Sequence, residues 1–426
     1  MLKRRRALLA ILALAVTFLL WSRPFHWTLR AGEPDARDFA PLIAGAHCLF
    51  HACNPYDSNV VEHLFQRLAG RNVFIVPEVP VYPPSSFLAV SPLLLLRWPA
   101  MHLAWTLLGG GLLLAVYVFL ILRFDLYTSV VAYLPIVFVI QSGIMFPALW
   151  VGQPIIIAAG CGLLGVTLLV SGEVPLLAIA LLVVSLALKP QVALAPALFL
   201  LFRRSTAKAA AAALAFAAAL LLAGAALLSF QLHSLSFFSQ ESANVKLSLQ
   251  PGRLSDPSAA NADSATFLNL QAPLSRLIPN LHADNLVAYA ISLALLVAIV
   301  LACLDPITRR NRPYTIIAAL VMLSTLPLYH RVFDGLLLIF VIPALAELRW
   351  RSRPLYWGVT ALSFLWFFSH RLLSHLFPRT ALFPYTAFVG VAICLGLILS
   401  LGVGRHGELR RQEGAALEAG GQPQPS

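Results

Sequence analysis

Charge is scarce in this chain, and that scarcity excludes an ordinary soluble fold. Only 11% of the 426 residues are charged, whereas 59% are hydrophobic, and the mean hydropathy is +0.82. Soluble domains carry about 25% charged residues, so this chain needs lipid as its solvent. Its long apolar runs also lack the polar/apolar alternation that the strands of a membrane barrel show. The sequence therefore predicts an all-α, polytopic membrane protein.

Acidic residues are fewer than basic ones, at 18 against 30, and the net charge is +12. Such an excess suggests nucleic acid in a soluble protein. Here the basic residues form short clusters between apolar runs, and we predict no nucleic-acid partner. Cytoplasmic loops of membrane proteins are rich in Lys and Arg, so all five clusters are predicted to face the cytoplasm. They are Lys3 to Arg6, Arg203/Arg204, Arg309/Arg310/Arg312, Arg349/Arg351/Arg353 and Arg405/Arg410/Arg411.

Cysteine is scarce too, and cofactor motifs are missing. The chain has five cysteines; Cys48 and Cys53 would pair in an oxidising compartment or stay two unpaired small apolar residues, and both alternatives are open. No His/Asp/Glu group has metal-ligand spacing, and no phosphate-binding loop occurs. We therefore predict no metal and no cofactor, and we disfavour nucleotide-driven transport.

The apolar runs predict one transmembrane domain over residues 1–404. One crossing needs about 20 apolar residues, which gives about 12 helices. The first, residues 7–21, would be an uncleaved anchor, because no small-x-small cleavage site follows it. Residues 405–426 are predicted to form a disordered cytoplasmic tail. Two crossings are expected from the candidates 85–96, 100–122 and 129–148, and later spans at 153–171, 174–188, 190–202, 208–229, 286–303, 313–329, 335–348, 355–369 and 384–402.

Two large loops would lie on the outer side. The first, residues 22–82, is predicted to contain two interfacial helices. Apolar residues recur at helical spacing in residues 36–51, which predicts one apolar stripe lying on the membrane surface. The peptide at 54–57 (NPYD) indicates a turn, after which Asp57 or Ser58 would cap a second helix that ends near Gly70. The second loop, residues 231–285, is rich in Ser, Asn, Gln and Ala, and its first half is predicted to be flexible.

Four segments, in this order, resemble glycosyltransferase family 87. They are DFAPLIAGAHCLFHACNPYD from residue 38, YPPSSFLAVSPLLLL from residue 82 with Trp105 following, Gly-Gln-Pro at 152–154, and ALKPQVAL from residue 187 with Arg203/Arg204 beyond it. The likeness covers roughly residues 35–335. It implies a membrane transferase of the GT-C fold, related to mycobacterial polyprenyl-phosphate-mannose-dependent mannosyltransferases.

The resemblance implies a chemistry and a location. The donor would be a polyprenyl-phosphate sugar, mannose or a related hexose, and the acceptor a lipid or a glycan. Transfer would invert the anomeric carbon on the extracytoplasmic face of a bacterial inner membrane. Such an enzyme must deprotonate an acceptor hydroxyl and stabilise the departing phosphate.

Asp38 is the candidate general base, because it matches the acidic residue that this fold places in the first outer loop. Asp35 is a nearby rival. The alternative without catalysis is that Asp35 caps the following helix and Asp38 complements the helix dipole in the first turn.

Cations near the outer boundary are candidates for the donor phosphate. Lys189 lies at a helix break, where a charge is costly unless it has a function, although a snorkelling lysine at a helix end is the alternative. His330 and Arg331 follow a span, with Asp334 nearby, and could bind phosphate. Equally, Arg331 and Asp334 could form an exposed ion pair of little energetic weight.

Three further residues are candidates for substrate binding. Gln153 begins a helix at the same membrane face, where amides could meet a sugar or phosphate. The alternative is that Gly152 only marks the start of the helix, as glycine often does. Tyr56 belongs to the turn of the first loop. Asn269 lies in residues 266–280, which are similar to the family's segment before the next span and would cover the cavity.

A transporter or flippase of a lipid-linked or amphiphilic substrate is the alternative function. In it Lys189, Arg331 and Asp334 would be charges along a pathway. This alternative predicts internal inverted repeats with broken helices in corresponding halves. No convincing repeat occurs in the sequence, so the transferase is favoured.

Overall fold

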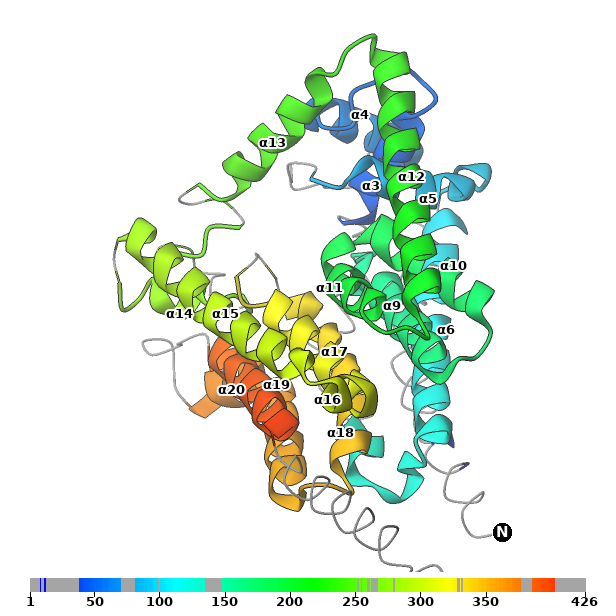
Figure 1. The fold of residues 1–426 in the computed structure, drawn as a ribbon. Coiled ribbons are helices and arrows are strands. Elements are labelled where there is room, and N and C mark those ends of the chain that lie inside the picture. Colours follow the sequence, from blue (N-terminus) through cyan, green and yellow to red (C-terminus); the bar gives the residue numbers. More distant parts are fainter. Residues whose placement is uncertain are drawn as a thin grey trace, which may run out of the picture.

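The computed structural model consists of helices joined by turns and short loops (Figure 1). It is 80% helical, and the residues that it describes contain no strand, in agreement with the predicted all-α class. Among those residues, three helices are long and apolar enough to cross a membrane: α6 (Ala100–Arg123), α12 (Ala207–Leu232) and α15 (Leu281–Leu304). The figure of about 12 crossings stays a prediction. The described residues are 8, 11–12, 38–69, 81–98, 100–134, 148–149, 151–250, 253, 255–258, 261, 267–278, 280–327, 330, 332–376 and 385–402.

The spans predicted between residues 153 and 402 all coincide with helices. The segment 85–96 forms a short α-helix and a 3-10 turn, too short for a full crossing. Most of 7–21 and 129–148, and all of 405–426, lie outside the described residues. The remaining elements are α3 (Phe39–Cys48), α4 (Ser58–Ala69), α5 (Pro84–Val90), η1 (Ser91–Leu95), η2 (Leu126–Thr128), η3 (Val130–Tyr133), α9 (Ile155–Ser171), α10 (Pro175–Leu188), α11 (Pro190–Leu201), α13 (Ser236–Ser248), α14 (Gln271–Leu274), α16 (Pro306–Asn311), α17 (Pro313–Ser324), η5 (Val332–Phe340), α18 (Val341–Leu348), α19 (Arg353–Leu376) and α20 (Tyr385–Gly402).

Helix α3 forms within the segment 36–51, but it does not present a single apolar stripe to the membrane. All of its residues except His47 are buried, so the helix lies inside the protein. Its small residues permit this enclosure: a Cβ at Gly45 would lie 2.2 Å from the Phe87 ring. The prediction of a single apolar stripe is therefore wrong, because the face opposite the stripe packs as closely as the stripe itself; the interfacial position of α3 stays a prediction.

The break between α10 and α11 is stabilised by α5. The Ser85 hydroxyl donates to the Ala187 carbonyl (3.0 Å), and the Ser86 hydroxyl donates to the carbonyls of Ala187 (2.9 Å) and Leu188 (3.1 Å). Because α10 ends at Leu188, its last carbonyls have no intrahelical N–H and need other donors. The two serines provide them, and they thereby fix the position of Lys189.

A glycine allows α12 to cross α5 closely, which gives a prediction for stability. A Cβ at Gly224 would lie 2.6 Å from the Pro84 carbonyl oxygen, whereas a Cβ at Gly111 in α6 would meet nothing within 4 Å. We expect Gly224→Ala to destabilise the protein by about 1–3 kcal/mol through overpacking. Gly111→Ala should be neutral or slightly stabilising. Thermal unfolding in detergent checks this, and equal melting temperatures for the two variants would contradict it.

Helix α13 lies in the half of the second outer loop that is predicted to be flexible. Figure 1 shows it leaving the upper end of α12. Its inner face contacts the first outer loop: Asn244 Nδ2 donates to the Tyr56 carbonyl (2.8 Å), and Asn54 Nδ2 donates to Gln240 Oε1 (2.5 Å). The Tyr56 ring stacks on Phe237 at 6.3 Å. The two loops that are predicted to be outer are therefore joined through polar and aromatic contacts.

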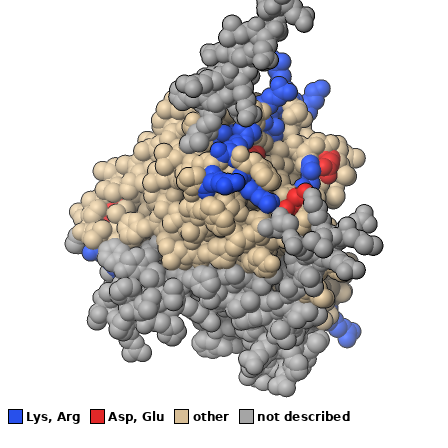
Figure 2. Space-filling view, turned by 90° about the horizontal axis from the view of Figure 1, so that it is seen from below, with Lys and Arg blue, Asp and Glu red and all other residues tan. Residues whose placement is uncertain are grey.

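The opposite end of the molecule is basic. Arg123, at the end of α6, donates to Ser171 Oγ (3.1 Å) and pairs with Glu173 (3.2 Å). Arg349, between α18 and α19, donates to the carbonyl of Asp125 (3.5 Å). Seen from below, Lys and Arg side chains gather on this face (Figure 2). Helices α6 and α9 run from this end to the end that holds Asp38 and Gln153.

Candidate active site

The structure brings Asp38 and Gln153 together. Gln153 Nε2 donates to Asp38 Oδ2 at 2.5 Å, and the two residues are only 6% and 8% exposed. The backbone N–H of Asp38 donates to the Val151 carbonyl (3.0 Å). Asp38 occupies the N-cap position of α3, yet its side chain makes no capping hydrogen bond. Asp38 therefore has a partner outside its own helix, while its role as base and its role in complementing the helix dipole both stay predictions. Asp35 lies outside the described residues.

An aromatic cluster supports this pair from behind. Phe39 stacks on Trp105 at 5.0 Å and on His102 at 6.0 Å. The Trp105 indole N–H donates to the Gly152 carbonyl (2.9 Å). Gly152 has φ +72°, and a Cβ there would lie 2.5 Å from Phe39 Cβ, so glycine is required. Because Gly152 has no side chain, the backbone of the Gly-Gln-Pro motif can lie close to the start of α3. This close approach places Gln153 against Asp38.

Tyr56 lies behind the site rather than in it. Its ring is 1% exposed, and its hydroxyl donates to the Tyr82 carbonyl (2.8 Å). The Tyr82 hydroxyl in turn donates to the Asp38 carbonyl (3.3 Å). Asn244 of α13 donates through Nδ2 to the Tyr56 carbonyl (2.8 Å). A chain of hydrogen bonds thus links α13 to the backbone of Asp38, and Tyr56 can act on substrate only by positioning these groups.

Glu241 makes this link sensitive to pH. Burial raises its pKa from the ordinary 4.5 to about 7. Burial disfavours the charged carboxylate relative to the neutral carboxyl group. Because the folded-state pKa is the higher one, the stabilisation is complete below pH 4.5 and is lost as the pH rises through 7.

We expect Glu241→Gln to remove this pH dependence, because an amide does not titrate in this range. The melting temperature of the variant relative to wild type should rise by about 2 °C between pH 5 and pH 8. Glu62→Gln, a neutralisation in α4, serves as the matched control and should show no such change. A constant difference between Glu241→Gln and wild type across this range would contradict the expectation.

The second group of site residues is a buried cluster of charges. Lys189 Nζ lies 2.5 Å from Asp334 Oδ1, and His330 Nδ1 lies 3.0 Å from Asp334 Oδ2. The side chains of Lys189, Asp334 and His330 are 14%, 7% and 0% exposed. Lys189 is therefore largely buried and paired with Asp334, and it is not a lone lysine that extends to the membrane surface. Arg331 lies outside the described residues, so its phosphate role and its pairing with Asp334 both stay predictions.

Asn269 is brought beside this cluster by backbone pairing. The N–H of Leu268 donates to the His330 carbonyl, and the N–H of Leu270 donates to the Leu326 carbonyl, each at 2.9 Å. Asn269 is 3% exposed, and its Oδ1, like His330 Nε2, is buried without a hydrogen-bond partner. Buried polar atoms normally have partners, so these two are available to a bound molecule.

The sequence missed Asp334 as the centre of this cluster. Lys189 and Asp334 are 145 positions apart, and no periodicity connects them. The aromatic support of Phe39 was missed as well. Only the adjacency of His330 and Asp334, at i and i+4, signals a contact in advance. In the described part of the chain, no group of three or more His, Cys, Asp or Glu residues could hold a metal ion.

The loop that carries Asp38 also holds a disulfide. Cys48, at the end of α3, is bonded to Cys53, which resolves the two alternatives that the sequence leaves open. The other cysteines, Cys161, Cys303 and Cys394, are free. Disulfides persist in oxidising compartments and are rare in the cytosol.

A buried carboxylate and a buried cation at one end of an apolar helical protein suit acid–base and phosphate chemistry at a membrane. The profile of glycosyltransferase family 87 matches residues 81–330. Because the match covers more than half of the chain, the protein belongs to glycosyltransferase family 87, and it is a membrane glycosyltransferase. The match includes Gln153, Lys189 and His330 but begins after Asp38. A comparison with curated proteins found no match.

Proposed function

We propose that this protein transfers a hexose, mannose or a related sugar, from a polyprenyl-phosphate donor to a lipid or glycan acceptor on the outer face of a bacterial inner membrane. The observation that carries the proposal is the buried contact between Asp38 and Gln153. A carboxylate that is enclosed, oriented by an amide and not used as a helix cap has the properties of a general base.

In this mechanism Asp38 takes the proton from the acceptor hydroxyl. The acceptor oxygen attacks the anomeric carbon, and the bond from that carbon to the phosphate oxygen breaks with its electron pair on the phosphate. Gln153 holds the Asp38 carboxylate in one orientation through its Nε2 hydrogen bond. Attack opposite to the leaving phosphate inverts the anomeric carbon.

The leaving phosphate would be bound by Lys189, His330 and Arg331. A lysine ammonium has three donors, and the contact with Asp334 occupies one of them. His330 holds Asp334 through Nδ1, and its buried Nε2, which has no hydrogen-bond partner, would meet the phosphate. The Asn269 side chain would contact the sugar or the phosphate from the segment paired with residue 330.

The transfer assay tests the proposal. Membranes with and without the protein are incubated with radiolabelled polyprenyl-phosphate-mannose and native lipid extract, and label is followed into new products. We expect new labelled products only when the protein is present, and the same assay with other hexoses identifies the sugar. Transfer from a soluble nucleotide sugar without any polyprenyl phosphate would refute the proposed donor.

The outer location of the active site has an independent test in the disulfide. In intact cells, an impermeant reductant followed by a bulky impermeant maleimide should add at least one label, at the half-buried Cys53, to the wild type and none to a Cys48→Ser/Cys53→Ser variant. The other cysteines lie in apolar helices, so they should stay unlabelled. Labelling that requires permeabilised cells would place this loop in the cytoplasm and would rule out an outer active site.

A further inference from the structure

Three buried polar atoms near residue 330 have no hydrogen-bond partner. They are Asn269 Oδ1, Gln271 Oε1 and His330 Nε2, and their residues are 3%, 4% and 0% exposed. Buried polar side-chain atoms normally have a partner in the protein or in ordered water. Three unpaired atoms in one region therefore indicate where a bound molecule supplies the missing hydrogen bonds.

The segments that carry these atoms are held against each other. Residues 268–270 pair with the segment that ends at His330 through two backbone hydrogen bonds. The Gln271 side chain reaches the same segment, because its Nε2 donates to the Pro327 carbonyl (3.1 Å). The three unpaired atoms thus belong to one small part of the molecule.

The contact with Pro327 fixes the orientation of the Gln271 amide. A carbonyl oxygen can only accept a hydrogen bond, so the group of Gln271 that faces Pro327 is the NH₂. The Oε1 atom is therefore the one that is left without a partner. A molecule that satisfies this oxygen must donate a hydrogen bond to it.

Only one part of a polyprenyl-phosphate sugar can make this donation. Its phosphate is an ionised diester with acceptor oxygens alone, so it is repelled by an amide oxygen. Its polyprenyl chain is apolar. The sugar hydroxyls each have a proton to donate. Gln271 Oε1 therefore fits a hydroxyl of the sugar, whereas the Lys189 ammonium fits the phosphate.

The unpaired atoms lie at the end of the molecule that holds the candidate base. His330 contacts Asp334 (3.0 Å), which in turn contacts Lys189 (2.5 Å). The helix break at Lys189 is fixed by α5. Tyr82, just before α5, donates to the Asp38 carbonyl (3.3 Å). Contacts between neighbouring groups thus connect the three atoms to Asp38.

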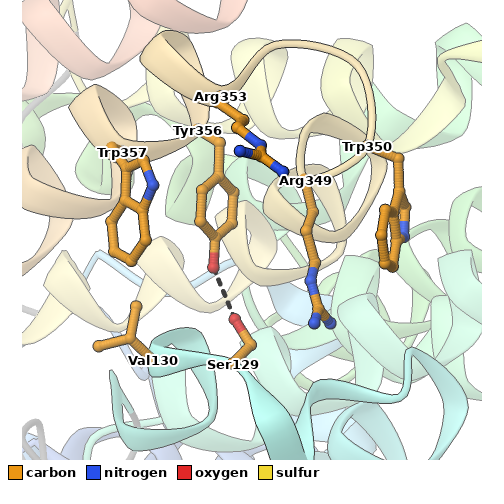
Figure 3. Close-up of a pocket in the computed structure, with 7 residues that line it drawn as sticks. All are labelled: Ser129, Val130, Arg349, Trp350, Arg353, Tyr356 and Trp357. Carbon is orange, nitrogen blue, oxygen red and sulfur yellow. Dashed lines mark hydrogen bonds between the residues drawn. The ribbon is translucent and has the colours of Figure 1, made fainter.

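The aromatic cavity in Figure 3 is a less suitable place for the sugar, although its volume is about 400 Å³. The hydroxyls of Ser129 and Tyr356 in its wall already pair with each other at 2.6 Å. Within the described residues, none of the unpaired buried atoms belongs to this wall. The cavity also lies beyond the Arg123 end of α6, and the helix between Trp105 and Arg123 rises by roughly 27 Å.

We propose that Gln271 is a residue of the sugar subsite, in which its Oε1 accepts a hydrogen bond from a hydroxyl of the transferred hexose and Asn269 Oδ1 accepts a second one. This inference rests on the proposed function, since the bound molecule is the lipid-linked sugar. A buried site of this kind rejects a sugar that lacks the hydroxyl, because the amide oxygen is then left unpaired. Gln271 thereby contributes to sugar selectivity, and the phosphate is bound by other residues.

The test compares the binding of lipids with and without a sugar to the full-length protein in nanodiscs. The probes are polyprenyl phosphate and its mannose, glucose and galactose derivatives. The variant Gln271→Met keeps the length of the side chain and removes the amide oxygen. We expect it to bind the preferred sugar lipid about 10-fold more weakly than the wild type does, a difference of about 1.4 kcal/mol. Its binding of bare polyprenyl phosphate should be unchanged.

Ser275→Ala is the control from the same region. It removes the hydrogen bonds from the Ser275 hydroxyl to the carbonyls of Ala272 (3.0 Å) and Pro257 (3.1 Å), but it removes no unpaired oxygen. This variant should bind every probe as the wild type does. A selective loss of sugar-lipid binding in Ser275→Ala equal to that in Gln271→Met would show that the effect comes from a loosened segment, and it would overturn the inference.

Single-deoxy derivatives of the preferred sugar identify the hydroxyl. One of them should bind the wild type about 10-fold more weakly than the parent lipid, and Gln271→Met should bind these two lipids equally. If Gln271→Met weakens sugar lipid and bare phosphate alike, or neither, the inference fails while the proposed donor stands. A wild type that binds none of the probes overturns the proposed donor as well. If Gln271→Met does not fold, equal binding of all deoxy derivatives by the wild type overturns the inference.

Discussion

Replacing Asp38 with asparagine is expected to lower sugar transfer by about 100- to 10,000-fold, the usual contribution of a general base. The amide keeps the size of the side chain and an oxygen that can accept the hydrogen bond from Gln153, so the fold should survive. It cannot take a proton from the acceptor hydroxyl. The measurement is the transfer of radiolabel at equal protein in the membrane, with the melting temperature recorded for the same samples.

Asp57→Asn is the matched control for this substitution. Asp57 lies in the same outer loop and accepts the Asn59 N–H at 2.9 Å before α4, and asparagine caps a helix about as well as aspartate. This variant should transfer sugar at the wild-type rate. Asp35→Asn tests whether Asp35, the rival candidate, is the general base instead. A loss with Asp35→Asn alone, or wild-type transfer by Asp38→Asn, would remove Asp38 from the mechanism.

The helices of this protein could be predicted from the sequence because lipid imposes one rule on every span. Each apolar run must satisfy its backbone internally, so the segments at 153–171 and 208–229 were recognised without any knowledge of packing. The number of crossings is harder to obtain. Helices such as α10 and α11 are too short for an independent crossing, and their break depends on the hydroxyls of Ser85 and Ser86.

The orientation and partners of helices could not be obtained in the same way. A segment with alanine and glycine on one face, such as α3, looks amphipathic, although small residues are also what close packing requires. The close approach of Gly45 to Phe87 shows that the small residues of α3 serve packing. This contact joins residues that are far apart in the sequence, so local sequence does not reveal it. Helix α13 shows the converse: a polar segment that is predicted to be flexible is held by Asn244 and Gln240.

The candidate site was predictable in its residue types but not in its pairing. Asp38, Gln153 and Lys189 each stand out in the sequence, because a polar group beside apolar runs is costly. Their partners come from distant segments: Gln153 reaches Asp38 across 115 positions. The charge balance of Lys189 depends on Asp334, which local sequence does not indicate.

Asp334→Asn is expected to destabilise the protein by about 3–5 kcal/mol, because it leaves buried positive charge without its counter-charge. Asp334 contacts both Lys189 and His330, and all three side chains are at most 14% exposed. The measurement is thermal unfolding in detergent. Glu173→Gln is the control, because it breaks an exposed ion pair: the side chains of Arg123 and Glu173 are 43% and 46% exposed. This substitution should change stability by less than about 1 kcal/mol.

A paired replacement separates stability from function. Lys189→Met/Asp334→Leu removes both charges, so it should recover most of the stability that Asp334→Asn loses. Sugar transfer should stay low, because the cation that binds the donor phosphate is gone. A stable double variant with wild-type transfer would show that Lys189 serves only the fold. A melting temperature of Asp334→Asn equal to that of wild type would show that water reaches the cluster and that its burial does not set the energetics.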